Sequence, residues 1–188
     1  MLSALLKRLC FPFLLLLTAC GGVEVQVTNG SDSSLQSTVT VHDRVTFRFN
    51  QLPESLESQQ SQNMSSSVQE NFIIQDASKL AETQQLFWPN DANTFLFQNV
   101  DFNTQQIVGV LRSSNSGCDY PWIRSILVKE TVFEIEVVQA TFGENVYCTT
   151  DIGFSVQFAL TDRISGLPAQ FIDLNETLVI NPNTLKSF

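Results

Sequence analysis

The sequence contains a single histidine, His42, among its 188 residues. One imidazole excludes zinc sites built from several histidines, and no motif supplies the acid and oxyanion hole that a nucleophile paired with it would need. The glycine-rich phosphate loop and the G-x-S-x-G, S-x-x-K and H-E-x-x-H motifs are also missing. We therefore expect no catalytic residue, no metal site and no cofactor. Glu134 and Glu136 alternate along an expected strand and are predicted to mark its solvent side.

The sequence has only one long hydrophobic run, Leu9 to Leu17. This run is shorter than the roughly 20 residues of a membrane-spanning helix. Lys7 and Arg8 precede it and small residues follow it, which is the pattern of a signal peptide over residues 1–19. The run ends in Leu17-Thr18-Ala19-Cys20, which resembles the lipobox of bacterial lipoproteins.

The lipobox resemblance implies that the Cys20 thiol receives a diacylglycerol, that the chain is cut before it, and that the new amino group is acylated. Two or three acyl chains, at about 0.8 kcal/mol per buried methylene, anchor a protein stably to a membrane. Gly21 follows, so the outer membrane is the default location in a bacterial cell envelope with two membranes. The alternatives are an ordinary secretory signal cut after Ala19 or an uncleaved anchor.

Basic residues are few: 10 Lys and Arg stand against 19 Asp and Glu. Loss of Lys7 and Arg8 with the signal leaves eight basic residues against nineteen acidic ones, a formal charge of −11. Such a balance argues against nucleic acid and keeps the body of the protein off anionic lipid. The anchor, rather than the fold, is then the contact with the membrane.

Cysteine is scarce as well, with four residues in the chain. Cys10 leaves with the signal and Cys20 is the expected lipid site. Cys118 and Cys148 remain in an oxidising export compartment, where one intramolecular pairing is possible. We predict a disulfide between them, with a free thiol as the alternative.

The remaining sequence divides at a polar stretch. Residues 20–49 form an N-terminal β segment with alternating strands at 23–28 and 39–49, expected to pair, and with His42 and Arg44 on the wetter face. Residues 50–71 have almost nothing to bury and are predicted to be a polar linker or mobile loop. Residues 72–188 form a β domain, although the N-terminal segment is small enough to pack on it instead.

Within the β domain the patterns predict one helix and many short strands. Asp76 is the expected N-cap of a helix with Leu80 and Phe87 on its apolar side, ended by Pro89. Lys129-Glu130-Thr131 is short enough to join two strands as a hairpin. The strands are expected at 72–74, 95–97, 107–111, 123–128, 132–138, 152–160 and 178–180. This arrangement is typical of a mainly antiparallel β sandwich or barrel.

Tyr120 and Trp122 flank Pro121 at the start of one expected strand. They are candidates for an exposed aromatic contact with a sugar or a peptide, although a tryptophan at a strand start more often belongs to the core. A disulfide at Cys118 would hold them in place.

Residues 72–165 carry an order of features that resembles the C-terminal domain of protease-complex-associated lipoproteins of the PrcB type. The features are "FIIQD", a short helix, the motif Val100-Asp101-Phe102 before a strand, a glycine-aromatic strand start and two further strands. Here Cys118 and Asp119 separate the glycine from the aromatic residue. The resemblance implies a non-catalytic module that binds and stabilises an exported protease.

The expected function is therefore a membrane-anchored envelope lipoprotein whose β domain binds a protein partner, as an accessory or inhibitory subunit of an exported protease. A structural or assembly lipoprotein is one alternative. A carbohydrate-binding module that uses Tyr120 and Trp122 is another.

The lipid anchor can be tested at its cysteine. Cys20→Ala removes the thiol that receives the lipid, so the variant should remain unprocessed or become soluble in membrane fractionation. Cys10→Ala, which lies within the signal, should fractionate as the unaltered protein does. Normal membrane retention of the Cys20 variant would contradict the anchor.

Overall fold

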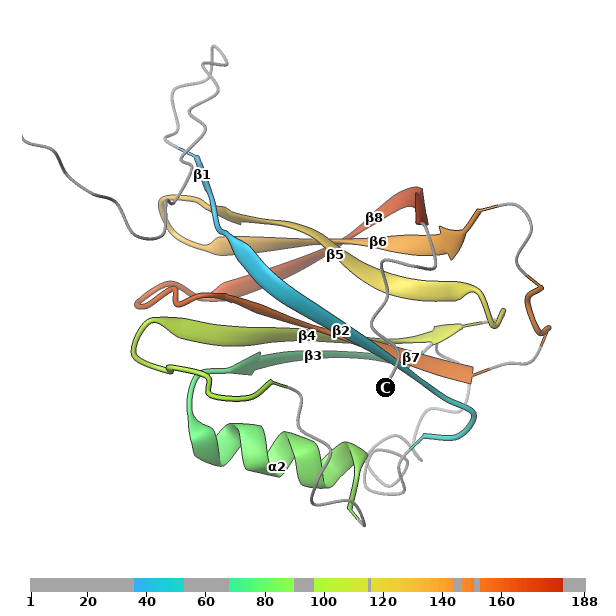
Figure 1. Cartoon of the computed structure of the whole chain (residues 1–188). Helices are drawn as coiled ribbons and strands as arrows, with labels where there is room; N and C mark the ends of the chain where they lie inside the picture. The colour runs from blue at the N-terminus through green and yellow to red at the C-terminus, as the bar shows by residue number, and fades with distance from the viewer. Residues whose placement is uncertain are drawn as a thin grey trace, which may run out of the picture.

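The computed structural model describes residues 36–52, 68–89, 97–114, 116–143, 147–150 and 153–180. Two four-stranded sheets face each other, and one helix covers the outer face of one of them (Figure 1). The elements are β1 (Ser37–Thr38), β2 (Val41–Phe49), β3 (Gln69–Ile74), α2 (Ala77–Phe87), β4 (Gln105–Ser114), β5 (Asp119–Val128), β6 (Phe133–Phe142), β7 (Gly153–Asp162) and β8 (Ala169–Ile180). The expected mainly β sandwich with one short helix is confirmed. Among the described residues, no helix has the length and apolar character needed to cross a membrane.

The sheet beneath the helix has the strand order β2-β7-β4-β3 and is antiparallel throughout. Its central strand β7 shows the predicted alternation over its described residues. Val156 and Phe158 are fully buried on the helix side, whereas Gln157 and Ala159 are fully buried on the side of the other sheet. Both rows are buried because both faces of the sheet are covered.

Helix α2 begins at the predicted cap. The Asp76 carboxylate accepts a hydrogen bond from the Lys79 amide at 2.7 Å, which satisfies one of the free N–H groups of the first turn. Phe87, at the end of the helix, is buried and packs its ring against those of Phe72 and Phe158, with centroids 5.6 and 5.7 Å away. The helix is held on the sheet by this aromatic contact.

The other sheet has the order β1-β5-β6-β8. The predicted hairpin over Lys129-Glu130-Thr131 joins β5 to β6 and is closed by a hydrogen bond from the Lys129 amide to the Val132 carbonyl at 2.9 Å. The expected short strand at 178–180 is wrong in extent, because β8 has 12 residues and pairs with β6 in parallel. Exposed polar residues along this edge strand obscure the alternation by which a half-buried strand is found in a sequence.

The N-terminal segment belongs to the sandwich as far as the structure describes it. Strand β2 pairs with β7 from Val41 to Phe49, so the possibility that this segment packs on the β domain is realised. The expected strand at 23–28, its pairing with 39–49, and residues 53–67 of the expected linker lie outside the described residues. So do residues 95 and 96 of the expected strand 95–97, whereas Phe97 lies in a bend, with its ring buried in the helix-side core.

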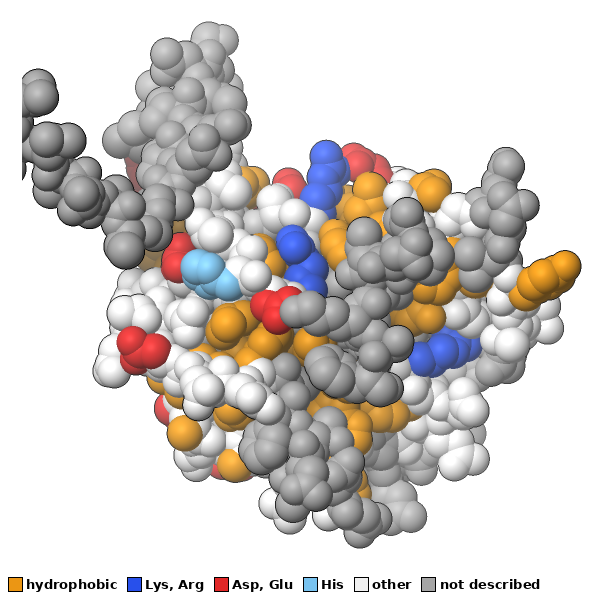
Figure 2. All heavy atoms as spheres, in the orientation of Figure 1, with side chains coloured by type: hydrophobic (Ala, Val, Ile, Leu, Met, Phe, Trp, Pro, Cys, Tyr) orange, Lys and Arg blue, Asp and Glu red, His pale blue; other side chains and the backbone are white. Residues whose placement is uncertain are grey.

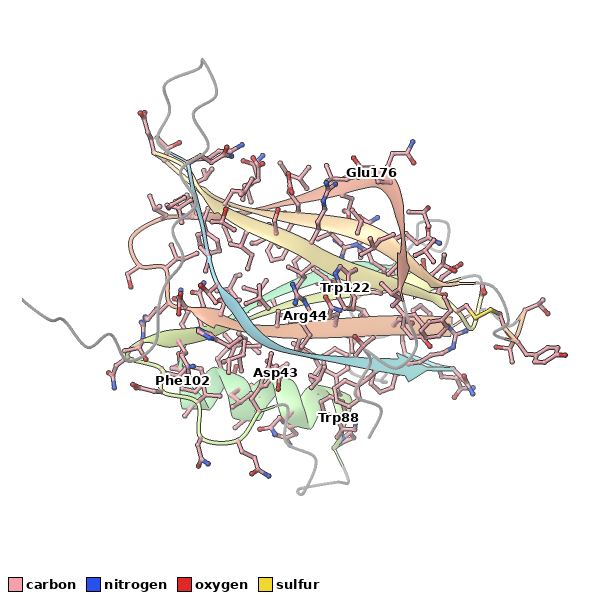
Figure 3. The ribbon with its side chains drawn as sticks, turned by 45° about the horizontal axis from the view of Figure 1, so that its top comes forward. Asp43, Arg44, Trp88, Phe102, Trp122 and Glu176 are labelled. Carbon is pink, nitrogen blue, oxygen red and sulfur yellow. A yellow bond between two sulfur atoms is a disulfide. The ribbon has the colours of Figure 1, made fainter. Side chains whose placement is uncertain are left out.

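The prediction that His42 and Arg44 share a wet face is wrong for Arg44. A register shift between Val41 and Asp43 separates the two side chains. His42 is exposed, with Nε2 2.7 Å from an Asp162 carboxylate oxygen. Arg44 turns toward the second sheet, where its guanidinium lies 5.1 Å from the Trp122 ring centroid (Figure 3). Burial lowers the pKa of Arg44, because water no longer surrounds the whole guanidinium.

Gly109 of β4 is required by the packing of the helix-side core. A Cβ at this position would lie 2.6 Å from the Phe158 ring and 3.2 Å from Phe72 Cβ. Gly109→Ala should therefore lower the free energy of unfolding by about 1 to 3 kcal/mol, as overpacked cores do, in urea-induced unfolding. Gly143→Ala is the matched control, since its Cβ would meet Val179 Cγ1 at 3.4 Å, an ordinary contact. Equal effects of the two substitutions would contradict this account.

Candidate functional site

A disulfide joins Cys118, just before β5, to Cys148, with the two Cα atoms 5.2 Å apart. The predicted pairing is confirmed. Beside it, the Gly117 amide donates a hydrogen bond to the Thr149 carbonyl at 2.8 Å. Gly117 has no side chain to collide with the Thr149 hydroxyl, which lies against its Cα. The bridge and this close backbone contact fix residues 147–150 to the start of β5.

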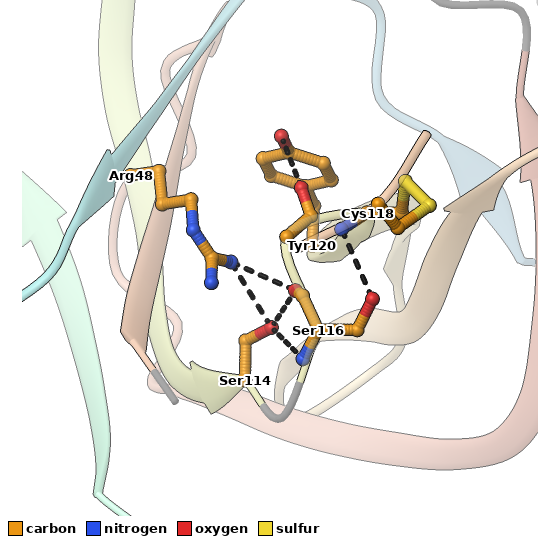
Figure 4. The surroundings of a disulfide bond; sticks show 7 residues. Arg48, Ser114, Ser116, Cys118 and Tyr120 are labelled. Atoms are coloured by element: carbon orange, nitrogen blue, oxygen red, sulfur yellow. Dashed lines mark hydrogen bonds between the residues drawn. A yellow bond between two sulfur atoms is a disulfide. The ribbon is translucent and has the colours of Figure 1, made fainter. Parts of the chain in front are cut away.

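A network of hydrogen bonds holds the turn before the bridge (Figure 4). The Ser116 carbonyl accepts hydrogen bonds from Arg48 Nη1 at 2.8 Å and from the Ser114 hydroxyl at 2.6 Å. The Cys118 amide donates to the Ser116 hydroxyl at 3.2 Å, and the Tyr120 hydroxyl donates to the Gly117 carbonyl at 3.0 Å. Strands β2, β4 and β5 therefore meet at this turn.

A cavity of about 260 Å³ opens between the two sheets beside this turn. It is lined by side chains from both sheets: Val68, Gln69, Arg112, Ser113, Ser114, Asp119, Tyr120, Pro121, Val137, Val138, Gln139, Asp173 and Leu174. We call the cavity together with the disulfide and residues 147–150 and 177–180 the disulfide end of the sandwich. The register brings these parts together, because Asp119 pairs with Thr141, which pairs with Val179.

Arg112 and Asp173 connect the two sheets at the wall of the cavity. Arg112 Nε lies 3.0 Å and Nη2 2.9 Å from Oδ1 of Asp173. The remaining guanidinium nitrogen, Nη1, donates to the Glu70 and Leu111 carbonyls and to the Asn71 side chain. The side chain of Arg112 is only 12 % exposed, so this pair is largely shielded from solvent on the arginine side.

Three large hydrophobic side chains are exposed among the described residues, and all belong to the disulfide end. Tyr147 is fully exposed, directly before Cys148, and Leu178 and Val179 of β8 are 40 % and 65 % exposed. Cations on the face drawn in Figure 2 stand as separate groups rather than as a continuous patch. Exposed large apolar side chains at one end of a rigid frame are candidates for contact with a partner protein.

Tyr120 and Trp122, the predicted contact residues, have different surroundings. Tyr120 lines the cavity and packs on Phe142, with ring centroids 5.2 Å apart. Desolvation raises the pKa of Tyr120; Arg48 acts in the opposite direction, and Asp119 raises the pKa further. Trp122 lies under Arg44 and does not line the cavity. Cys20 is outside the described residues.

Sequence reasoning missed Tyr147, Leu178 and Val179. A signal was present for Tyr147, a single aromatic residue in the polar run "GENVYCTT" next to a bridged cysteine. No such signal marks Leu178 and Val179, whose exposure follows from the edge position of β8.

The two carboxylates predicted to mark the solvent side of a strand have structural partners. Glu134 lies 2.6 Å from Lys129 Nζ, and Glu136 accepts a hydrogen bond from the Ser125 hydroxyl. Within the described ranges, no group of three or more His, Cys, Asp and Glu side chains could hold a metal ion.

The motif Val100-Asp101-Phe102 builds a turn. The Asp101 carboxylate accepts hydrogen bonds from the Asn103 amide at 3.0 Å and from the Thr104 hydroxyl at 3.0 Å. The Asp101 backbone carbonyl accepts a hydrogen bond from the Gln105 amide at 2.7 Å. The backbone hydrogen bond from Asn103 is the main cause of a lowered pKa at Asp101. Val100 and Phe102 pack against the helix-side core.

Comparison of the chain with protein-family models, with curated proteins and with solved structures found no match. The resemblance to protease-associated lipoproteins stays a prediction.

The disulfide closes a loop with a sequence separation of 30 residues. In the chain-entropy model such a loop stabilises a fold by about 3 to 4 kcal/mol, so the double change Cys118→Ala and Cys148→Ala should lower the free energy of unfolding by about that amount. The unaltered protein should resist alkylation without reductant and gain two alkylated thiols after reduction. A native thiol that is readily alkylated at either position would contradict the bridge.

Proposed function

We propose that this protein is a lipid-anchored component of the bacterial cell envelope whose β domain binds a partner protein through the disulfide end. The observation that carries the proposal is that the exposed large hydrophobic side chains of the described residues, Tyr147, Leu178 and Val179, all lie at one end of the sandwich. Exposed side chains of this kind lose water-accessible apolar area when a partner covers them, and tyrosine is among the residues that contribute most to such interfaces.

The frame beneath this surface favours recognition. The disulfide and the hydrogen bonds around Ser116 hold the segment that carries Tyr147 to β5. A segment fixed before binding loses less conformational entropy when the partner arrives. Residues on loops positioned by a rigid scaffold are a common arrangement in binding domains.

Strand β8 adds a second means of binding. It lies at the edge of its sheet, with β6 on one side and no described strand on the other. Edge strands present unpaired backbone N–H and C=O groups, to which an extended segment of another protein can add as a further strand. Leu178 and Val179 belong to this strand and flank its free edge on opposite faces of the sheet.

The anchor would set the place of binding. An acyl group on Cys20 would hold the domain at a membrane, while the acidic body is repelled by anionic lipid. The partner would then be an exported or envelope protein. The finer proposal, that the partner is an exported protease and this protein its accessory or inhibitory subunit, rests on the resemblance of residues 72–165 alone.

The proposal can be tested by placing a photo-crosslinking amino acid at position 147 in intact cells. We expect a discrete crosslinked product with one partner, and Val179→Asp should remove it, since a charge there opposes burial of the apolar contact. The same crosslinker at Glu130, in the hairpin at the opposite end of β5, is the control and should give no such product. Identical products from the two positions, or none from position 147, would overturn the proposal.

A further inference from the structure

One charged group of the cavity at the disulfide end is still able to accept hydrogen bonds from a ligand. All three nitrogens of Arg112 donate to protein oxygens, so the main cation of the cavity offers no free donor. The Asp119 carboxylate, in contrast, has no hydrogen bond or ion pair with the described part of the chain. An ionised carboxylate accepts several hydrogen bonds, so Asp119 can accept them from a ligand.

The position of Asp119 makes this carboxylate available to a ligand. In β5 the side chains of Asp119, Pro121 and Ile123 share one face, because alternate residues of a strand point the same way. Pro121 and Ile123 are buried, and Asp119 is the member of this row nearest the open end of the sandwich. The second cation nearby, Arg48, is already engaged with Ser114 and Ser116.

Apart from Asp119 and the Arg112–Asp173 pair, the lining is uncharged, and its apolar part suits a hydrocarbon stem rather than a second charge. Val68, Pro121, Val137, Val138 and Leu174 provide hydrocarbon surface beside the carboxylate. A cavity of about 260 Å³ is smaller than the roughly 300 to 1,000 Å³ that hold drug-sized ligands. Lysine and arginine side chains combine a hydrocarbon stem with a charged head, and they bury the stem while pairing the head.

We propose that the cavity receives a lysine or arginine side chain of the bound partner, with Asp119 as its counter-ion. This inference rests on the proposed function, since it names the chemistry that the partner brings to the disulfide end. The acidic balance of the chain, a formal charge of −9, favours a partner that is basic at its contact. A partner segment added to β8 would pass the cavity, because Asp173 and Leu174 belong both to β8 and to the cavity wall.

The probe is a pair of capped peptides, acetyl-Val-Arg-Val-amide and acetyl-Val-Gln-Val-amide, titrated into the full chain in detergent micelles. Binding is followed by the NMR signals of the Gln69 and Gln139 side-chain amides, which line the cavity. The arginine peptide should shift these signals, and the glutamine peptide should bind at least about tenfold more weakly, the loss expected for one charge-assisted hydrogen bond. n-Butylguanidinium serves as a third ligand; if it binds as tightly as the arginine peptide, the cavity is a site for free cations and the proposal of a partner side chain is overturned.

Asp119→Asn should weaken binding of the arginine peptide about tenfold, because the amide keeps the shape of the carboxylate and loses its charge. Glu130→Gln makes the same change of charge at the opposite end of β5 and should leave binding unchanged. Thermal unfolding of both variants confirms that the fold is intact. Equal binding of the two peptides, or unchanged affinity in the Asp119 variant, would overturn the inference.

These results separate the two proposals. If the crosslink at position 147 persists while Asp119→Asn has no effect on the peptides, the partner surface stands and the basic side chain in the cavity does not. If the arginine peptide binds through Asp119 while no crosslink forms, the cavity is a cation site and the proposed partner surface falls.

Discussion

The stability of the sandwich depends on which side chains form hydrogen bonds with the backbone groups at the open edge of β5. Strand β1 pairs only with residues 127 and 128 of β5, so the first part of β5 has no neighbouring strand on that side among the described residues. The buried side chain of Gln157, from β7 of the other sheet, accepts a hydrogen bond from the Ile123 amide at 2.7 Å. Its own amide group donates a hydrogen bond to the Thr46 hydroxyl at 3.3 Å. Arg44 Nη2 donates to the Ile123 carbonyl at 3.3 Å. A backbone group left buried without these partners would destabilise the fold by about 1 to 3 kcal/mol.

This requirement divides the space between the sheets into two regions. Toward one end the facing side chains are apolar, with Val108, Val110 and Ala159 against Ile126 and Ile135. Toward the disulfide end they are polar, with the arginines, serines and glutamine that bond to the β5 edge, to the turn at Ser116 and to Asp173. Polar side chains with fixed hydrogen-bond directions fill space less completely than branched apolar ones, which accounts for a cavity at this end.

Much of the fold could be predicted from the sequence because the patterns that specify helices, turns and strands are local. The Asp76 cap, the hairpin at Lys129-Glu130-Thr131 and the alternation of β7 each depend on residues close in the chain. The Cys118–Cys148 pairing followed from the number of cysteines left once the expected signal and lipid site are set aside. The errors occurred where a neighbour from elsewhere in the chain decides the environment. Arg44 lies between sheets because both faces of β2 are covered, and the polar edge strand β8 has no alternation to reveal it.

The residues of the candidate site also divide into those that the sequence indicated and those that only the structure brought to light. Position in the sequence singled out Tyr120, and the structure places it on the wall of the cavity, while Trp122, two residues on, lies under Arg44. Tyr147 and Val179 are 32 residues apart and lie at the same end of the sandwich because of the register of β5, β6 and β8 and the disulfide.

The sequence by itself determined the secondary structure that local periodicity and caps specify, the one possible disulfide and the acidic balance. Tertiary structure alone decided which polar side chains are buried, which strand forms an edge and where the cavity opens. The physical reason is that burial and satisfaction of a polar group depend on which partners the sheet register brings within hydrogen-bonding distance, and register is a property of pairs of distant segments.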